Sequence, residues 1–147
     1  MTRLRTERGT ALVEVTWLSI LLLVPMLYVV LAVFEVQRAA FAVDAATRAA
    51  GRAYSLAPTQ AAGAARARTA ASVAMSDQGL SLSRAQVAIR CVPSPGSCLS
   101  PGSVIQVRIT FPVALPLMPA ALGGNTPSIR VESSQAVPYG SFRENRP

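Results

Sequence analysis

Side chains that could carry chemistry are few in this chain of 147 residues. It has no histidine, and all 14 basic residues are arginine, so the usual general base and the commonest metal ligand are absent. Its two cysteines, Cys91 and Cys98, are too few for a structural zinc site, which takes four Cys or His ligands. Because nucleophile, base and metal-ligand sets are all missing, we expect no enzyme, no metal, no cofactor and no small-molecule substrate.

Glu14 is the acidic residue in the most unusual position. From Val15 to Phe34 no residue is charged, and about 20 residues at about 1.5 Å each cross a hydrocarbon core of about 30 Å. A carboxylate about one turn into such a helix is favoured by the helix dipole, lies at headgroup level, or is held for a partner inside the membrane. The residues alone leave these three interpretations open.

A basic segment precedes the apolar helix. Residues 1–9 hold three arginines against one glutamate, which predicts a cytoplasmic N-terminus and an extracytoplasmic remainder. A cleaved secretory signal is the alternative, but its apolar region spans about 7 to 15 residues. Here the first A-x-A site, at 40–42, follows the charged Glu35. We therefore expect a single-pass membrane protein in contact with lipid.

The formal charge of +7 raises the possibility of a nucleic-acid partner. The arginines are scattered, however, and only 5% of residues are aromatic, so few side chains could stack on bases. We expect no nucleic-acid binding.

Helical character continues beyond the membrane to about Leu56, because the segment is rich in alanine and lacks proline. At 100° per residue a polar face opposes an alanine face suited to close packing. Glu35 and Arg38, at i,i+3 spacing, are expected to pair within one chain, and an intersubunit contact of Glu35 is the alternative. Thr59 is a candidate N-cap for a second helix that ends near Gly79.

After Gly79 the period changes to alternation, which predicts three strands in a small antiparallel meander. They cover residues 86–91, 105–111 and 128–137. Pro112 is expected to end regular pairing, with residues 112–122 folding over the sheet as a loop or, if exposed, forming an apolar contact patch.

The two cysteines flank a turn containing Pro93, Pro95 and Gly96. A Cys91–Cys98 disulfide would clamp the loop between the first two strands, and it requires an oxidising compartment. Two free thiols in a cytoplasmic loop are the alternative. The expected fold is α+β, with a long helix, a second short helix and about three strands. Its segments are a leader at 1–9, a transmembrane helix at 10–36, a helical region at 37–78 and a disulfide-clamped β domain at 79–147.

Four segments resemble known pilin-like proteins. Gly9 stands before Thr10 at the start of the apolar helix with Glu14 five residues on, which is similar to a type IV prepilin signal. The chain more narrowly resembles the TadE family of pseudopilins from Tad (tight adherence, Flp-type) pili of actinobacteria. The matching segments are RGTALVEV at 8–15, FEVQRAAF at 34–41, AATRAAGRA at 45–53 and VPYGSFRE at 137–144.

The resemblance implies that a prepilin peptidase cuts between Gly9 and Thr10. It also implies that Glu14, then fifth in the mature chain, acts in filament assembly. The expected function is a minor structural subunit in pilus assembly or cell adhesion, whose partners are other pilins or pseudopilins and the Tad assembly platform. The alternative is an uncleaved, signal-anchored envelope protein with a basic extracellular binding domain that never enters a filament.

Overall fold

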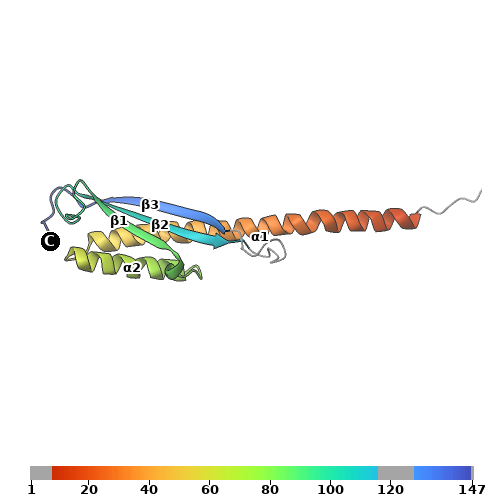
Figure 1. The fold of residues 1–147 in the computed structure, drawn as a ribbon, viewed down its shortest axis with the longest axis horizontal. Coiled ribbons are helices and arrows are strands. Elements are labelled where there is room, and N and C mark those ends of the chain that lie inside the picture. The colour runs from red at the N-terminus through yellow and green to blue at the C-terminus, as the bar shows by residue number, and fades with distance from the viewer. Residues whose placement is uncertain (1–7, 116–127, 147) are drawn as a thin grey trace, which may run out of the picture.

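The computed structural model describes residues 8–115 and 128–146. It has the α+β architecture that the sequence predicts, with a long apolar N-terminal helix, a second helix and an antiparallel sheet (Figure 1). The elements are α1 (Arg8–Ser55), α2 (Gln60–Ser76), the short 3-10 helix η1 (Leu82–Arg84), and the strands β1 (Gln86–Val92), β2 (Val104–Ala114) and β3 (Ser128–Pro138).

Helix α1 is continuous through 48 residues, which corresponds to a length of about 72 Å. Its N-terminal half extends away from the rest of the fold (Figure 1), and the most apolar stretch has none of its residues buried. Side chains such as Trp17 and Leu22 are 67% and 71% exposed. By length and composition α1 is able to span a membrane, in agreement with the sequence prediction.

The C-terminal half of α1 forms one wall of the core. Its alanine face is buried as predicted, with Ala39, Ala42, Ala46 and Ala50 at 0–1% exposure, whereas Arg48 on the opposite face is exposed. Small side chains let a second helix approach closely, and α2 packs here. The residues that α2 buries recur every four positions: Gly63, Ala67, Ala71 and Met75.

Both ends of α2 are capped as the sequence predicts. The Ala62 N–H donates to Thr59 Oγ1 at 3.2 Å, which satisfies one of the free amides of the first turn. At the other end Gly79 has a φ of +69°, and the Leu80 N–H donates to the Met75 carbonyl at 3.0 Å. Only glycine adopts this backbone conformation without strain, so Gly79 ends the helix.

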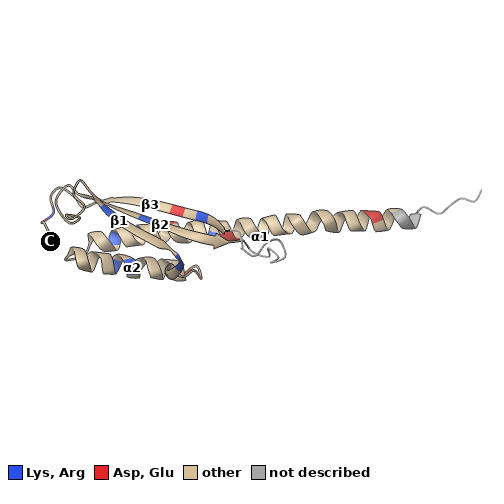
Figure 2. Ribbon diagram, in the orientation of Figure 1, with Lys and Arg blue, Asp and Glu red and all other residues tan. Residues whose placement is uncertain are grey.

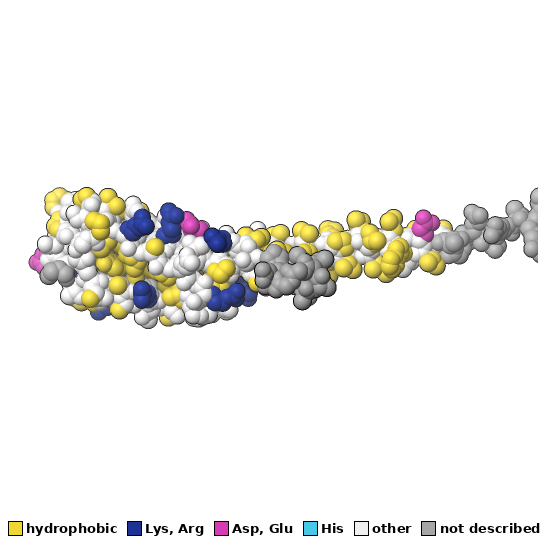
Figure 3. Space-filling view, viewed as in Figure 1, with side chains coloured by type: hydrophobic (Ala, Val, Ile, Leu, Met, Phe, Trp, Pro, Cys, Tyr) yellow, Lys and Arg dark blue, Asp and Glu magenta, His cyan; other side chains and the backbone are white. Residues whose placement is uncertain are grey.

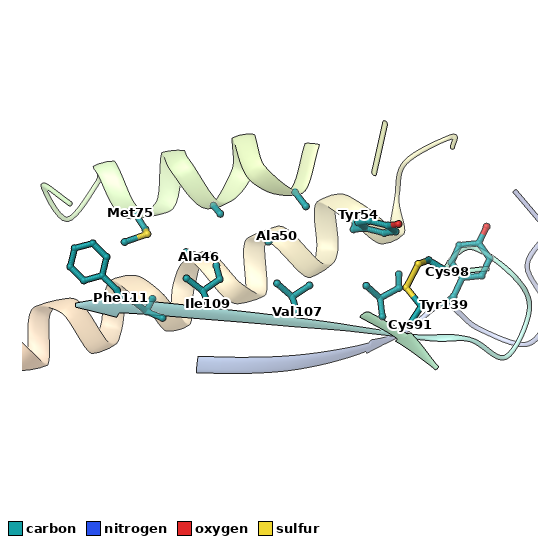
Figure 4. Close-up of a cluster of buried hydrophobic side chains, with 14 of the residues drawn as sticks. Ala46, Ala50, Tyr54, Met75, Cys91, Cys98, Val107, Ile109, Phe111 and Tyr139 are labelled. Carbon is teal, nitrogen blue, oxygen red and sulfur yellow. A yellow bond between two sulfur atoms is a disulfide. The ribbon is translucent and has the colours of Figure 1, made fainter. Parts of the chain in front are cut away.

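The three strands form the predicted meander in the order β1-β2-β3, with both pairs antiparallel. Alternate residues of β2 face the helices and are buried, and Figure 4 shows Val107, Ile109 and Phe111 pointing toward α1 and α2. Residues from both helices and from the sheet share one core. The Ser133 hydroxyl of β3 also donates to Asp44 Oδ1 of α1 at 3.2 Å.

The prediction that Pro112 ends strand pairing is wrong. Strand β2 continues to Ala114, and Pro112 pairs with Arg130 of β3. The pairing of β1 with β2 stops at Thr110, so beyond that residue β2 is itself an edge strand. Proline is tolerated there because no third strand needs its missing N–H. The rest of the expected loop, residues 116–122, lies outside the described residues.

The cysteines form the predicted disulfide. Cys91 at the end of β1 is bonded to Cys98, with a Cα–Cα distance of 5.1 Å, and closes the loop between β1 and β2. Both residues are buried near Tyr139 (Figure 4). This excludes the alternative of two free thiols.

Candidate assembly site

Glu14 lies near the start of α1, within its exposed apolar half. Figure 2 shows a long stretch of this helix without charged residues between Glu14 and the next acidic residue, Glu35. The described residues form three ion pairs, and Glu14 takes part in none of them. An ionised carboxylate at this position in lipid is costly until a cation approaches it.

The Gly9–Thr10 bond lies in the first turn of α1. The first N–H groups of a helix have no partner within the helix, so this turn is the easiest part to open. Glycine lowers helix stability by about 1 kcal/mol relative to alanine, which makes opening at Gly9 easier still. The backbone at this point is therefore easier to unwind than the interior of the helix.

Glu35 forms the intrachain pair that the sequence predicts. Its Oε2 atom lies 2.7 Å from Arg38 Nη2, and both side chains are a little under half exposed. Exposed pairs of this kind contribute only about 0 to 1 kcal/mol. An additional contact of Glu35 with a neighbouring subunit stays a prediction.

The predicted site residues lie in three separate places. Glu14 and Glu35 are 21 positions apart on one helix, a distance of about 31 Å along its axis. The disulfide belongs to the other end of the domain, where the Gly140 carbonyl accepts from Gly102 and Arg143 Nη1 donates to the Ser55 carbonyl at 2.9 Å. Glu14 with the adjacent Gly9–Thr10 bond is thus a local site near the helix start, and the disulfide has a structural role.

Sequence reasoning missed a second feature, a hollow on the outer face of the sheet. Arg90 and Arg108 line it together with Gln106 and Ser134. The sequence does show the alternation of residues along each strand, and this alternation places these side chains on one face. Their proximity depends on strand register, which places Arg90 opposite Gln106 and Arg108 opposite Ser134.

Comparison with protein-family models, with curated proteins and with solved structures finds no match to this chain. The fold defines its class as a single helix of membrane-spanning length that carries a small disulfide-bonded α+β domain. The function is therefore inferred from the residues of this chain and their placement.

Proposed function

We propose that this chain is a minor, TadE-type pilin-like subunit of a Tad or type IV-like pilus, with a structural role in pilus assembly or adherence. The observation that carries the proposal is the single carboxylate of Glu14, set in an exposed apolar helix four residues after Thr10. The chain crosses the membrane once, with its N-terminus in the cytoplasm and its domain outside.

The proposed mechanism is lateral association of α1 helices, guided by one charge pair. Cleavage after Gly9 gives Thr10 a free α-amino group, which neutralises Glu14 of a neighbouring subunit. Thr10 and Glu14 are about 6 Å apart along the helix axis, so the neighbour is shifted by about that amount. At 4 Å and an effective dielectric constant of 20, two unit charges attract by about 4 kcal/mol. The pair therefore favours one register over others.

Figure 3 supports this mechanism with the surface of α1. Hydrophobic side chains surround the N-terminal half of the helix. Lipid or the α1 helices of other subunits are the surroundings that suit such a surface. Since α1 continues without a break into the core, packed helices would hold each outer domain at a fixed position.

N-terminal sequencing of the membrane-extracted protein tests the processing step. A start at Thr10, lost in Gly9→Leu or without the prepilin peptidase, supports the proposal. An intact Met1 would contradict it and favour the uncleaved envelope protein.

Two variants test the role of Glu14. Glu14→Ala is expected to insert normally and to abolish pilus incorporation, measured by subunit content of sheared filaments. The control is Glu14→Ala with Leu18→Glu, which keeps one carboxylate in the helix but moves it about 6 Å along the axis. This double variant is expected to stay unassembled. Normal assembly of either variant would refute the register role.

A further inference from the structure

The sheet has one face on the helices and one face that the described residues leave open. On the open face Arg90 of β1 is the diagonal neighbour of Arg108 of β2, and Arg130 of β3 lies further along the same face. Figure 2 shows basic residues on all three strands, and Figure 3 shows them gathered over the sheet. Glu132 of β3 is an acid on the same face, so the three arginines leave the open face with a net positive charge.

A hollow of about 210 Å³ lies between the first two of these arginines. Its lining is Ala88, Arg90, Gln106, Val107, Arg108 and Ser134. Ala88 and Ser134 are the cross-strand neighbours of Arg108 on its two sides. Because these two side chains are short, they leave space between the longer arginine and glutamine side chains.

The lining is rich in hydrogen-bond donors. Each guanidinium carries five N–H groups, and the Gln106 amide and the Ser134 hydroxyl add further donors. Arg108 Nη1 lies 3.0 Å from Glu132 Oε1, so its charge is partly compensated, whereas Arg90 belongs to none of the ion pairs found in residues 8–115 and 128–146. The hollow thus presents a net positive charge and many donors.

We propose that this hollow binds a phosphate group of a phosphate-bearing polymer outside the membrane. Each phosphate of such a polymer is a diester that carries one negative charge on two free oxygens, and an arginine fork binds these two oxygens in a bidentate manner. Arg130 lies four residues before Ser134 on β3, about 13 Å along the strand. Glu132 lies between Arg130 and the hollow but is paired with Arg108, so Arg130 adds a further cation beyond the hollow for an extended polymer to reach.

Phospholipid headgroups are too distant to be the source of this phosphate. Val137 of β3 packs on Gly51 of α1, and its neighbour Ala136 pairs with Gln106 in the hollow. Gly51 lies 16 residues beyond Glu35, or about 24 Å along the helix. The headgroup layer on each side of a bilayer is only about 5 to 8 Å thick. This exclusion rests on the proposed membrane span, whereas the chemistry of the hollow does not.

Calorimetric titration of the full chain in phosphatidylcholine nanodiscs at low salt tests the proposal. The probes are poly(glycerol phosphate), inorganic phosphate, phosphatidylglycerol vesicles and polyglutamate. We expect the phosphate polymer to bind most tightly of the four. Equal or tighter binding of polyglutamate would overturn the proposal in favour of an acidic protein partner. Equal binding of inorganic phosphate, or of the vesicles, would overturn the polymer as the source.

Charge-matched variants locate the site. Arg90→Gln and Arg108→Gln are each expected to weaken polymer binding at least tenfold, and Arg68→Gln on the exposed surface of α2 by less than twofold. Glu132→Gln is expected to tighten binding, because it releases Arg108 and removes the nearby negative charge. If Arg90→Gln and Arg68→Gln weaken polymer binding equally, the hollow is not the binding site. N-terminal processing does not affect this titration, so the pilin proposal and the phosphate site fail or stand separately.

Discussion

Gly51 lies where α1 packs closely on the sheet, and its replacement by alanine tests how tightly the two layers pack. A Cβ built on Gly51 would lie 2.7 Å from Cγ2 of Val137 in β3 and 3.8 Å from Cγ2 of Val107 in β2. Real Cβ atoms essentially never come as close as the first distance. Val137 has a branched, stiff side chain, so the backbones must separate to relieve the contact.

Two opposing terms set the expected size of the effect. Alanine in place of glycine within a helix stabilises it by about 1 kcal/mol. Overpacking a well-packed core costs about 1 to 3 kcal/mol. Gly51→Ala should therefore lower the free energy of unfolding of the domain by about 1 kcal/mol. Once Val137→Ala has removed the contacting methyl groups, the same substitution should instead raise it by about 1 kcal/mol.

Native-state hydrogen exchange of β2 amides, with the full chain in detergent micelles, measures these changes. Ala45→Gly, at an exposed position of α1, calibrates the helix-propensity term alone. A sign reversal of the Gly51→Ala effect between the two backgrounds is the expected result. If Gly51→Ala stabilises the domain equally in both backgrounds, α1 and β3 do not pack as closely as described.

Three further outcomes follow from the outer end of the domain. Replacing Cys91 and Cys98 with alanine should cost about 2.5 kcal/mol by the chain-entropy relation for a closed loop of this size, and dithiothreitol should reproduce the loss in urea unfolding. Burial raises the pKa of Tyr54. The stability that its neutral phenol contributes is therefore present below pH about 10 and is lost as pH rises through the folded-state pKa. In Tyr54→Phe the free energy of unfolding should fall less over this alkaline range. Tyr139→Phe, which removes a hydrogen bond of 2.9 Å to the Glu144 carbonyl, should cost about 1 kcal/mol in the same unfolding assay.

Local signals predict most of the fold because each one has a local physical cause. Thr59 and Gly79 mark the ends of α2 through their own hydrogen bonding and backbone freedom. Alternation between apolar and polar residues predicts the strands, and the short spacing of Cys91 and Cys98 predicts the disulfide. These features need no knowledge of distant contacts.

Features that depend on strand register or on relative strand length cannot be predicted from local sequence signals. Pro112 lies within β2 only because β1 is shorter and leaves that part of β2 at an edge. The hollow beside Arg108 exists because Ala88 and Ser134 happen to be its cross-strand neighbours. The roles of Gly9 and Glu14 concern a peptidase and a neighbouring subunit, and they stay predictions.

The continuous course of α1 constrains how a neighbour can reach Glu14. Ala32 and Ala50 lie 18 and 36 residues beyond Glu14, which correspond to about five and about ten helical turns. The three residues therefore project from nearly the same side of the helix, and Ala50 is buried beneath the domain. A neighbouring helix that contacts Glu14 would thus approach on the side over which the domain sits. Because the same helix forms the core wall, a neighbour that contacts Glu14 in the proposed assembly would have to be placed along the axis so that it clears the domain.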